Sequence, residues 1–209
     1  MKYIAEKMIK NSRHINYYNS LNSDIQKEII DKINTLILEE KQYCDNGNYS
    51  HLCNIFAAIS IYEVLQSHGK TKQEAFDIVS EEMYKFIQTS KRRFQKLSRY
   101  KLFWPVMKKI IPIGFKYGSG TGWRYTWHFD DEDKNQFRFE TNECIYQKIF
   151  KKRSIEELGP MFCKCDIINY GELNNIDFIR TKTLCYEDDM CDFKFVKHLN
   201  NNFIRSDSK

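Results

Sequence analysis

These 209 residues contain no long hydrophobic run and no recognisable secretory signal. The best apolar stretch, residues 55–65, contains Glu63 and falls short of the roughly 20 residues that a membrane-spanning helix needs. Residues 1–14 carry charges but no apolar segment, so they do not resemble a signal peptide. We therefore expect a cytoplasmic protein.

Glycine and proline are also scarce, with 8 and 3 residues, which argues against a collagen-like or linker-dominated chain. Phenylalanine and tyrosine, in contrast, number 15 and 13, enough to fill a large core. Hydrophobic residues make up 42% and charged residues 29%, as in folded globular proteins. The net charge of +5 is too small to indicate a nucleic-acid partner. We expect one domain over residues 1–209.

The seven cysteines are an odd number, so they cannot all pair within one chain. Without a leader, they are expected to be free, metal-bound or catalytic thiols in a reducing compartment. No pair has the C-x-x-C spacing of a zinc site, so neither a metal site nor a cofactor is predicted. A divalent metal held by residues distant in sequence stays open. Five cysteines gather in the last third: Cys144, Cys163, Cys165, Cys185 and Cys191.

The first half of the sequence has helical periodicity. Isoleucines recur every four residues behind a Ser-x-x-Gln pattern that predicts a capping box at Ser23. A second apolar stripe, on one helical face, covers residues 52–65, and another capping box at Thr71 begins a third helix. We expect the last two helices to pack as a hairpin and residues 20–115 to be mainly helical.

Prolines and glycines cluster over residues 105–122. Pro105 and Pro112 lack an amide proton, so we expect them to end any long helix in this region. The run Gly118-Ser-Gly-Thr-Gly precedes a strand pattern and lacks the Lys-Ser or Lys-Thr of a phosphate-binding loop. The cluster therefore predicts a change from helix to sheet rather than a nucleotide site.

Beyond this cluster the hydrophobic period changes to two. Aromatic and polar residues alternate on either side of the acidic residues 130–133, which predicts an antiparallel pair of strands joined by a turn. We expect residues 120–197 to form a mostly antiparallel sheet with inserted short helices, and residues 200–209 to form a flexible tail. The fold class is α+β, with N-terminal helices packed on the sheet. The expected strands cover residues 123–129, 137–140, 178–185 and 191–197.

Several segments of the second half resemble one known family. Arg180-Thr-Lys-Thr-Leu, followed by Cys191-Asp-Phe-Lys-Phe, resembles the C-terminal signature of the L-2-amino-thiazoline-4-carboxylic acid hydrolase family. That signature is approximately R-x-x-T-L-A-x-G, a short turn, and C-D-F-x-F. The likeness covers about residues 50–197. Upstream segments that also resemble the family are Glu143-Cys144 with Tyr146, and Glu157-Leu158 with Cys165-Asp166.

The chain departs from this pattern in the turn after Leu184. It has Cys185 and Glu187 where the family has alanine and glycine, so a glycine that permits a positive φ is lost. The resemblance also extends to small-molecule-binding domains of the 4-vinyl-reductase type. It implies an α+β ligand-binding fold.

The family resemblance implies hydrolytic opening of a 2-aminothiazoline ring that carries a carboxylate, giving a carbamoyl-cysteine. Attack on the ring carbon needs a thiolate or an activated water, and an acid must protonate nitrogen as the tetrahedral centre collapses. We predict Cys165 as the nucleophile or an essential thiol, Asp166 as the acid/base and Arg180 as the clamp for the substrate carboxylate. The other residues expected in the pocket are Cys144, Cys191 and Asp192.

Two other functions stay open. The altered turn at residues 185–187 leaves open a related domain that binds or senses a small molecule without catalysis. Residues 91–101 place six cations around two apolar side chains, and more apolar residues follow them. Segment 91–115 therefore predicts, as the second alternative, a peripheral contact with an anionic membrane. The expected partner is a small molecule rather than a nucleic acid, and the sequence does not indicate an oligomeric state.

Overall fold

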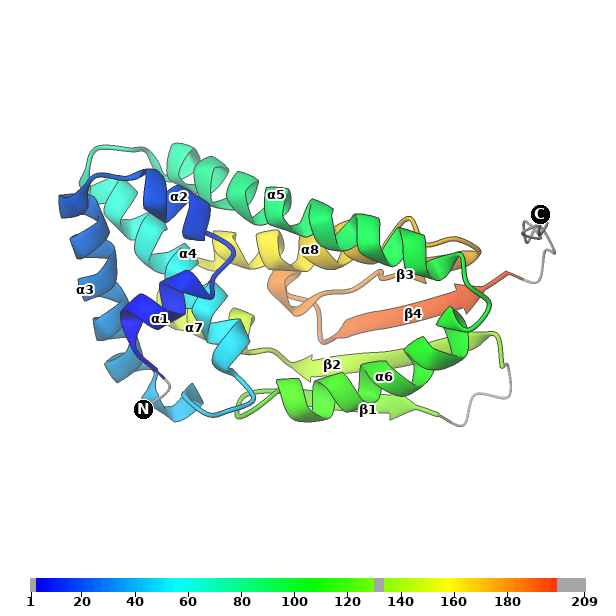
Figure 1. The fold of residues 1–209 in the computed structure, drawn as a ribbon. Coiled ribbons are helices and arrows are strands. Elements are labelled where there is room, and N and C mark those ends of the chain that lie inside the picture. Colours follow the sequence, from blue (N-terminus) through cyan, green and yellow to red (C-terminus); the bar gives the residue numbers. More distant parts are fainter. Residues whose placement is uncertain (1–2, 130–133, 199–209) are drawn as a thin grey trace, which may run out of the picture.

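The computed structural model describes residues 3–129 and 134–198, so the predicted turn at 130–133 and the predicted tail lie outside the described residues. A helical N-terminal half is followed by a four-stranded antiparallel sheet, which confirms the α+β class (Figure 1). No helix in these two ranges has the length and apolarity to cross a bilayer. The elements are α1 (Ala5–Lys10), α2 (Ile15–Ser20), α3 (Ser23–Glu39), η1 (Lys41–Tyr43), α4 (Tyr49–Ser67), α5 (Lys72–Ser98), α6 (Phe103–Gly118), β1 (Arg124–His128), β2 (Gln136–Glu143), α7 (Ile145–Lys152), η2 (Glu156–Leu158), α8 (Gly159–Tyr170), β3 (Ile176–Ile179), η3 (Leu184–Tyr186) and β4 (Cys191–Lys197).

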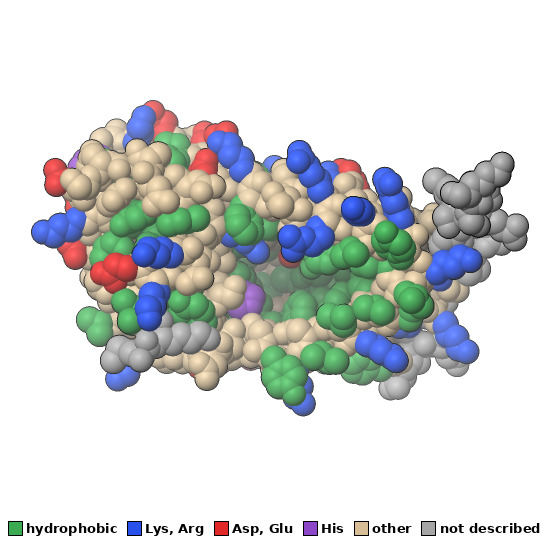
Figure 2. All heavy atoms as spheres, viewed as in Figure 1, with side chains coloured by type: hydrophobic (Ala, Val, Ile, Leu, Met, Phe, Trp, Pro, Cys, Tyr) green, Lys and Arg blue, Asp and Glu red, His purple; other side chains and the backbone are tan. Residues whose placement is uncertain are grey.

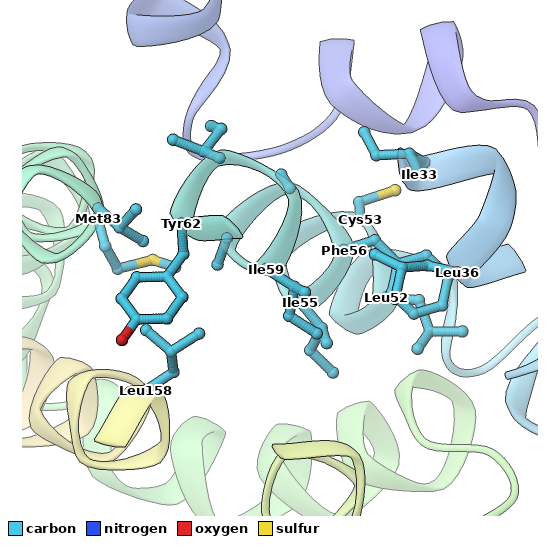
Figure 3. Close-up of a cluster of buried hydrophobic side chains, with 14 of the residues drawn as sticks. Ile33, Leu36, Leu52, Cys53, Ile55, Phe56, Ile59, Tyr62, Met83 and Leu158 are labelled. Carbon is cyan, nitrogen blue, oxygen red and sulfur yellow. The ribbon is translucent and has the colours of Figure 1, made fainter. Parts of the chain in front are cut away.

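Helix α4 is the centre of the N-terminal half. Residues 52–62 are buried without interruption, so this helix is buried on every side rather than along the one expected stripe. Helices α1, α3 and α5 pack around it, and α5 forms the predicted hairpin with it. In Figure 3, Phe56 and Tyr62 of α4 lie among side chains from neighbouring helices, including Ile33 and Met83. These interlocking side chains leave the N-terminal half tightly filled.

The starts of the helices follow from local side chains. The Thr71 hydroxyl accepts from the Glu74 amide, and the Glu74 carboxylate accepts from the Thr71 amide at 2.8 Å. This confirms the second capping box. The prediction at α3 was wrong by one residue: Asn22, not Ser23, is the N-cap, and its Oδ1 accepts from the Ile25 amide.

Helix α6 contradicts the expectation that the two prolines end any long helix. Pro105 lies in the first turn, where a missing amide proton costs nothing, whereas Pro112 lies inside the helix. Trp104 and Met107 are buried against the aromatic face of the sheet, and Phe115 packs beside them. This burial offsets the hydrogen bond lost at Pro112, so the helix continues to Gly118.

The sheet has the order β1-β2-β4-β3, and every neighbouring pair is antiparallel. The predicted pairing of the first two strands is confirmed, with Trp127 opposite Phe139. Phe139 is also opposite Phe193 of β4. The two rings stack with centroids 4.6 Å apart. The central strands therefore present a continuous aromatic face to α6.

The strand expected over residues 178–185 is wrong beyond Ile179, where β3 ends. The Asp192 carboxylate accepts hydrogen bonds from the backbone amides of Thr181 and Lys182. Because these amides are bound by a side chain, they are not available to a neighbouring strand. The chain turns there instead.

Glu187 occupies the position of the lost glycine. Its backbone has φ 67° and ψ 14°, the left-handed region that favours glycine. The turn is closed nonetheless, because the Thr183 amide donates to Asp188 Oδ2 at 2.7 Å. The chain therefore keeps a left-handed turn with a residue that carries a Cβ atom.

Candidate functional site

A cavity of about 800 Å³ lies between α5, α6, the sheet and α8. Figure 2 shows it as a hollow in the middle of the face viewed, with hydrophobic side chains inside it. The walls formed by α6 and the sheet are mainly aliphatic and aromatic, with hydroxyls from Ser119 after α6 and Thr141 of β2. The other polar and charged lining residues come from the loop before α2, from α4, from α8 and from the segment after β3: Arg13, Ser50, His51, Asn54, Asp166, Asn169 and Arg180.

Helix α8 supplies the acidic group, and it has no counterpart among the expected elements. It begins at Gly159 and Pro160, and proline is favoured at this helical position. Cys163, Asp166 and Asn169 follow at intervals of three, so they share one face of the helix. All three line the cavity.

Asp166 is the central charged group of the site. Its Oδ2 accepts from Arg180 Nη1 at 2.9 Å, and Arg180 Nη2 donates to the Cys163 carbonyl at 2.8 Å. Burial raises the pKa of Asp166 to about 6, although Arg180 and Arg13 act in the opposite direction. Near neutral pH this carboxyl is therefore able both to take and to return a proton, as general acid–base catalysis requires.

Arg13 brings a second guanidinium toward Asp166. It lies between α1 and α2, and its Nη1 contacts Met83 Sδ at 3.4 Å. Its charge lowers the pKa of Asp166 and of the Cys165 thiol, each against a larger effect of burial. No carboxylate in residues 3–129 and 134–198 forms an ion pair with Arg13. The Arg13 guanidinium is therefore available to bind an anionic ligand.

Cys165 and Cys163 differ sharply as thiols. Cys165 is 4% exposed, its Sγ donates to the Met161 carbonyl at 3.4 Å, and burial raises its pKa to about 12. Cys163 Sγ lies 3.1 Å from Thr183 Oγ1, and hydrogen bonds from Cys185 and Thr183 lower its pKa despite burial. Cys163 therefore has the greater thiolate character.

The thiols of Cys163 and Cys191 contact the Thr183 hydroxyl, and two more thiols lie next to them. Cys191 Sγ donates to Thr183 Oγ1 at 3.6 Å, and Cys185 forms side-chain hydrogen bonds with Cys144 and Cys163. All of these cysteines are free. Within the described part of the chain, no group of three or more His, Cys, Asp or Glu side chains is arranged to hold a metal ion.

Asn169 contributes an unsatisfied acceptor. Its Oδ1 is buried in the cavity wall and has no hydrogen-bond partner among the described residues. A buried polar atom without a partner costs about 1–3 kcal/mol, so a ligand N–H placed there would recover that loss. Asn169 follows Asp166 by three positions on α8, which puts this acceptor on the same side as the carboxyl.

His51 is neutral and fully engaged. Its Nε2 donates to the Gly118 carbonyl at 2.9 Å, so Nδ1 accepts from the Tyr146 hydroxyl at 2.8 Å. Burial lowers the pKa of His51 to about 4. His51 therefore joins α4 to the end of α6 and to α7, and neither ring nitrogen is left to act as a base.

Residues 51–195 match the family model of L-2-amino-thiazoline-4-carboxylic acid hydrolase. The chain belongs to this hydrolase family. No curated protein and no solved structure matches the chain. The match to the L-2-amino-thiazoline-4-carboxylic acid hydrolase family begins within α4, so it includes the polar face of α8 but leaves out Arg13.

The structure brings together most of the residues that the motifs of this family singled out. Asp192 is the exception, because it does not line the cavity and its carboxylate instead binds the turn after β3. Arg13 and Asn169 were missed, since one precedes the family segments and the other belongs to no motif. The lining residues named from the sequence are Cys144, Cys165, Asp166, Arg180 and Cys191.

Proposed function

We propose that this protein hydrolyses a 2-aminothiazoline-type ring that carries a carboxylate, and that the ring opens beside Asp166. Membership of the hydrolase family supports the reaction class. The observation that carries the proposal is the carboxyl of Asp166, with its pKa near 6, held by Arg180 in the wall of the cavity. Such a group is suited to moving protons at neutral pH.

In the proposed reaction Asp166 accepts a proton from water while the water oxygen bonds to the ring carbon between nitrogen and sulfur. The tetrahedral centre then collapses to a carbonyl, and the bond from this carbon to ring nitrogen or sulfur breaks. Asp166 returns its proton to the departing atom, and the second proton of the water leaves the new carbonyl oxygen for the ring nitrogen. One water is consumed and the product is a carbamoyl-cysteine. Arg180 holds the carboxylate in place through its 2.9 Å hydrogen bond.

Arg13 is the proposed clamp for the substrate carboxylate. Arg180 was the sequence-based choice, but two of its donors are already bound to Asp166 and to the Cys163 carbonyl. Arg13 forms hydrogen bonds with the sulfur atoms of Met83 and Cys165 but with no carboxylate among the described residues, so it has donors left for a bidentate contact. Asn169 Oδ1 would accept from the exocyclic amino group.

A covalent route through a thiol is the alternative for the same ring opening. Both Cys163 and Cys165 line the cavity. The sequence favours Cys165, whereas the lowered pKa of Cys163 favours Cys163 as the nucleophile. Replacing each with alanine separates the routes. Loss of turnover in Cys163→Ala alone would support Cys163, loss in Cys165→Ala alone would support Cys165, and activity in both would support the water route.

Turnover of 2-aminothiazoline-4-carboxylate under reducing conditions tests the proposal, with carbamoyl-cysteine followed by mass spectrometry. Asp166→Asn should lower kcat/KM by about 10²- to 10⁴-fold, because a general acid–base group contributes that much. Asp177→Asn is the matched control, since Asp177 is an exposed carboxylate of β3 outside the cavity. Full activity in Asp166→Asn would contradict the proposed role. Saturable binding by folded wild-type protein without product would favour a non-enzymatic binding or sensing domain.

We also infer a peripheral membrane contact for segment 91–115. Its apolar side chains Leu102, Ile110 and Ile113 are 73%, 59% and 55% exposed. Lysine and arginine side chains surround them, and Figure 2 shows both kinds together over α6. Exposed apolar and basic side chains in one segment are typical of helices that lie on an anionic bilayer.

Sedimentation with lipid vesicles tests the membrane contact. The protein should bind vesicles that contain phosphatidylserine at low salt. It should dissociate at high salt, because salt screens the attraction between its lysine and arginine side chains and the anionic lipid. Ile113→Asp should weaken binding, whereas Leu38→Asp, at an even more exposed apolar position on α3, should not. Failure to bind at low salt would contradict the inference.

A further inference from the structure

The cavity is larger than the proposed ring requires. A 2-aminothiazoline-4-carboxylate is one five-membered ring with two small polar substituents. The cavity holds about 800 Å³, within the range of roughly 300–1,000 Å³ that is typical of pockets for much larger ligands. Most of this space would be left empty by the ring alone.

The rest of the cavity wall is apolar. Helix α6 contributes Met107, Ile111 and Phe115, and the Phe115 ring lies 5.1 Å from that of Phe139 on the sheet. Helix α5 contributes Phe94 and further apolar residues. Burying apolar surface is favourable, so these walls would gain most from an apolar occupant.

Some of these lining side chains are poorly covered by the protein itself. Leu97 of α5 is 44% exposed and Ile110 of α6 is 59% exposed, although both line the cavity. Comparable side chains around α4, such as Ile55, are 0% exposed. Contiguous exposed apolar surface of this kind marks a binding site.

We propose that the natural ligand is an amphiphilic carboxylate whose long alkyl or aryl group lies between α5, α6 and the sheet. Its carboxylate head binds Arg13, which has no carboxylate partner among the described residues. The inference rests on the proposed function in one respect, because it assumes that the head lies beside Asp166, where the ring opens. The binding of the alkyl or aryl group between α5, α6 and the sheet does not depend on that assumption.

Gly114 offers a way to fill this space. It lies on α6 and lines the cavity, and a Cβ atom added to it meets no other atom within 4 Å. The backbone at this position therefore has room for a side chain, and we expect a large one to extend into the space of the proposed ligand. Gly114→Trp is the blocking variant, and Gly114→Ala is its matched control.

Titration calorimetry with straight-chain carboxylates, from butanoate to dodecanoate below their micelle concentrations, tests the proposal. The Kd of the wild-type protein should fall by up to about fourfold per methylene, because each buried methylene contributes roughly that factor. The Gly114→Trp variant should lose this dependence, whereas Gly114→Ala should keep it. Arg13→Gln should weaken all the acids by a similar factor, and Arg13→Lys should recover part of the loss.

A wild-type Kd that does not change with chain length would overturn the proposal. An unchanged slope in folded Gly114→Trp would overturn the placement of the chain beside α6. If that variant does not fold, Ile110→Asp, at an exposed position of the same wall, replaces it and should flatten the slope. The proposed hydrolysis is tested separately. If the bare ring is hydrolysed but Kd does not depend on alkyl chain length, only this inference is wrong. If Kd depends on alkyl chain length but no ring is hydrolysed, only the proposed function is wrong.

Discussion

The helices around α4 and the layer formed by α6 and the sheet use apolar side chains in opposite ways. Around α4 they are enclosed on all sides, and Phe56 and Ile59 are 0% exposed. Around α6 they border a hollow, and Ile110 stays 59% exposed. The side chains around α4 are fully packed by other parts of the protein, and this region serves as a scaffold. The side chains of α6 and the sheet are only partly packed, so their surface is available to a ligand.

The sharpest test of this contrast is to shorten one phenylalanine in each region. Phe56→Ala should lower the free energy of unfolding by about 3–5 kcal/mol, because it opens a void in a filled core. Phe115→Ala should cost about 1 kcal/mol, since Phe115 is half-buried and already borders open space. Urea unfolding followed by circular dichroism measures both. Equal losses would show that the α6 layer is packed as tightly as the scaffold.

A second test asks whether the α6 and α8 region carries the chemistry. Only the ionised form of Asp166 accepts a proton, so kcat/KM should fall as the pH drops through about 6. Arg180 lowers the pKa of Asp166, so Arg180→Gln should move this acidic limb to higher pH by about one unit.

The full pH–rate profile is the measurement, because a merely structural loss would lower activity at every pH without moving the limb. Arg124→Gln is the control for lost positive charge. Arg124 pairs with Glu143 on the sheet and does not line the cavity. A limb that stays in place in Arg180→Gln would contradict the role of Arg180.

The smallest expected effect concerns the turn beside the site. Glu187→Gly should raise the free energy of unfolding by about 0.5–1 kcal/mol, because the left-handed conformation at φ 67° costs a residue with a Cβ atom more than it costs glycine. Glu187→Ala keeps the Cβ atom and should bring no gain. Thermal unfolding of the two variants separates backbone strain from loss of the exposed carboxylate.

Local sequence patterns were enough for the parts of the fold that depend on local chemistry. The hairpin of α4 and α5 follows from apolar period and from the Thr71 capping box, and the β1–β2 pair follows from alternation. Helix α8 was not predicted, because its apolar residues do not form a single stripe along the helix. The continuation of α6 through Pro112 depends on burial against the sheet, which a local rule about proline does not contain.

The site shows the same division. Family motifs led to Asp166 and Arg180, which the structure joins through a hydrogen bond. Arg13 belongs to no motif and reaches the site only through the packing of the N-terminal helices. The unsatisfied oxygen of Asn169 is likewise a property of packing, since the sequence shows an amide but not whether it has a partner.

The contact between Cys185 and Gly159 limits the order in which this chain can accumulate substitutions. A Cβ atom at position 159 would lie 2.8 Å from Cys185 Sγ, closer than two such atoms tolerate. The Cys185 Cβ atom would lie 3.0 Å away, so a side chain at 159 would be crowded even by alanine at 185. Glycine at 159 is therefore expected wherever residue 185 carries a side chain in this position, and these two sites, distant in sequence, are expected to share one history.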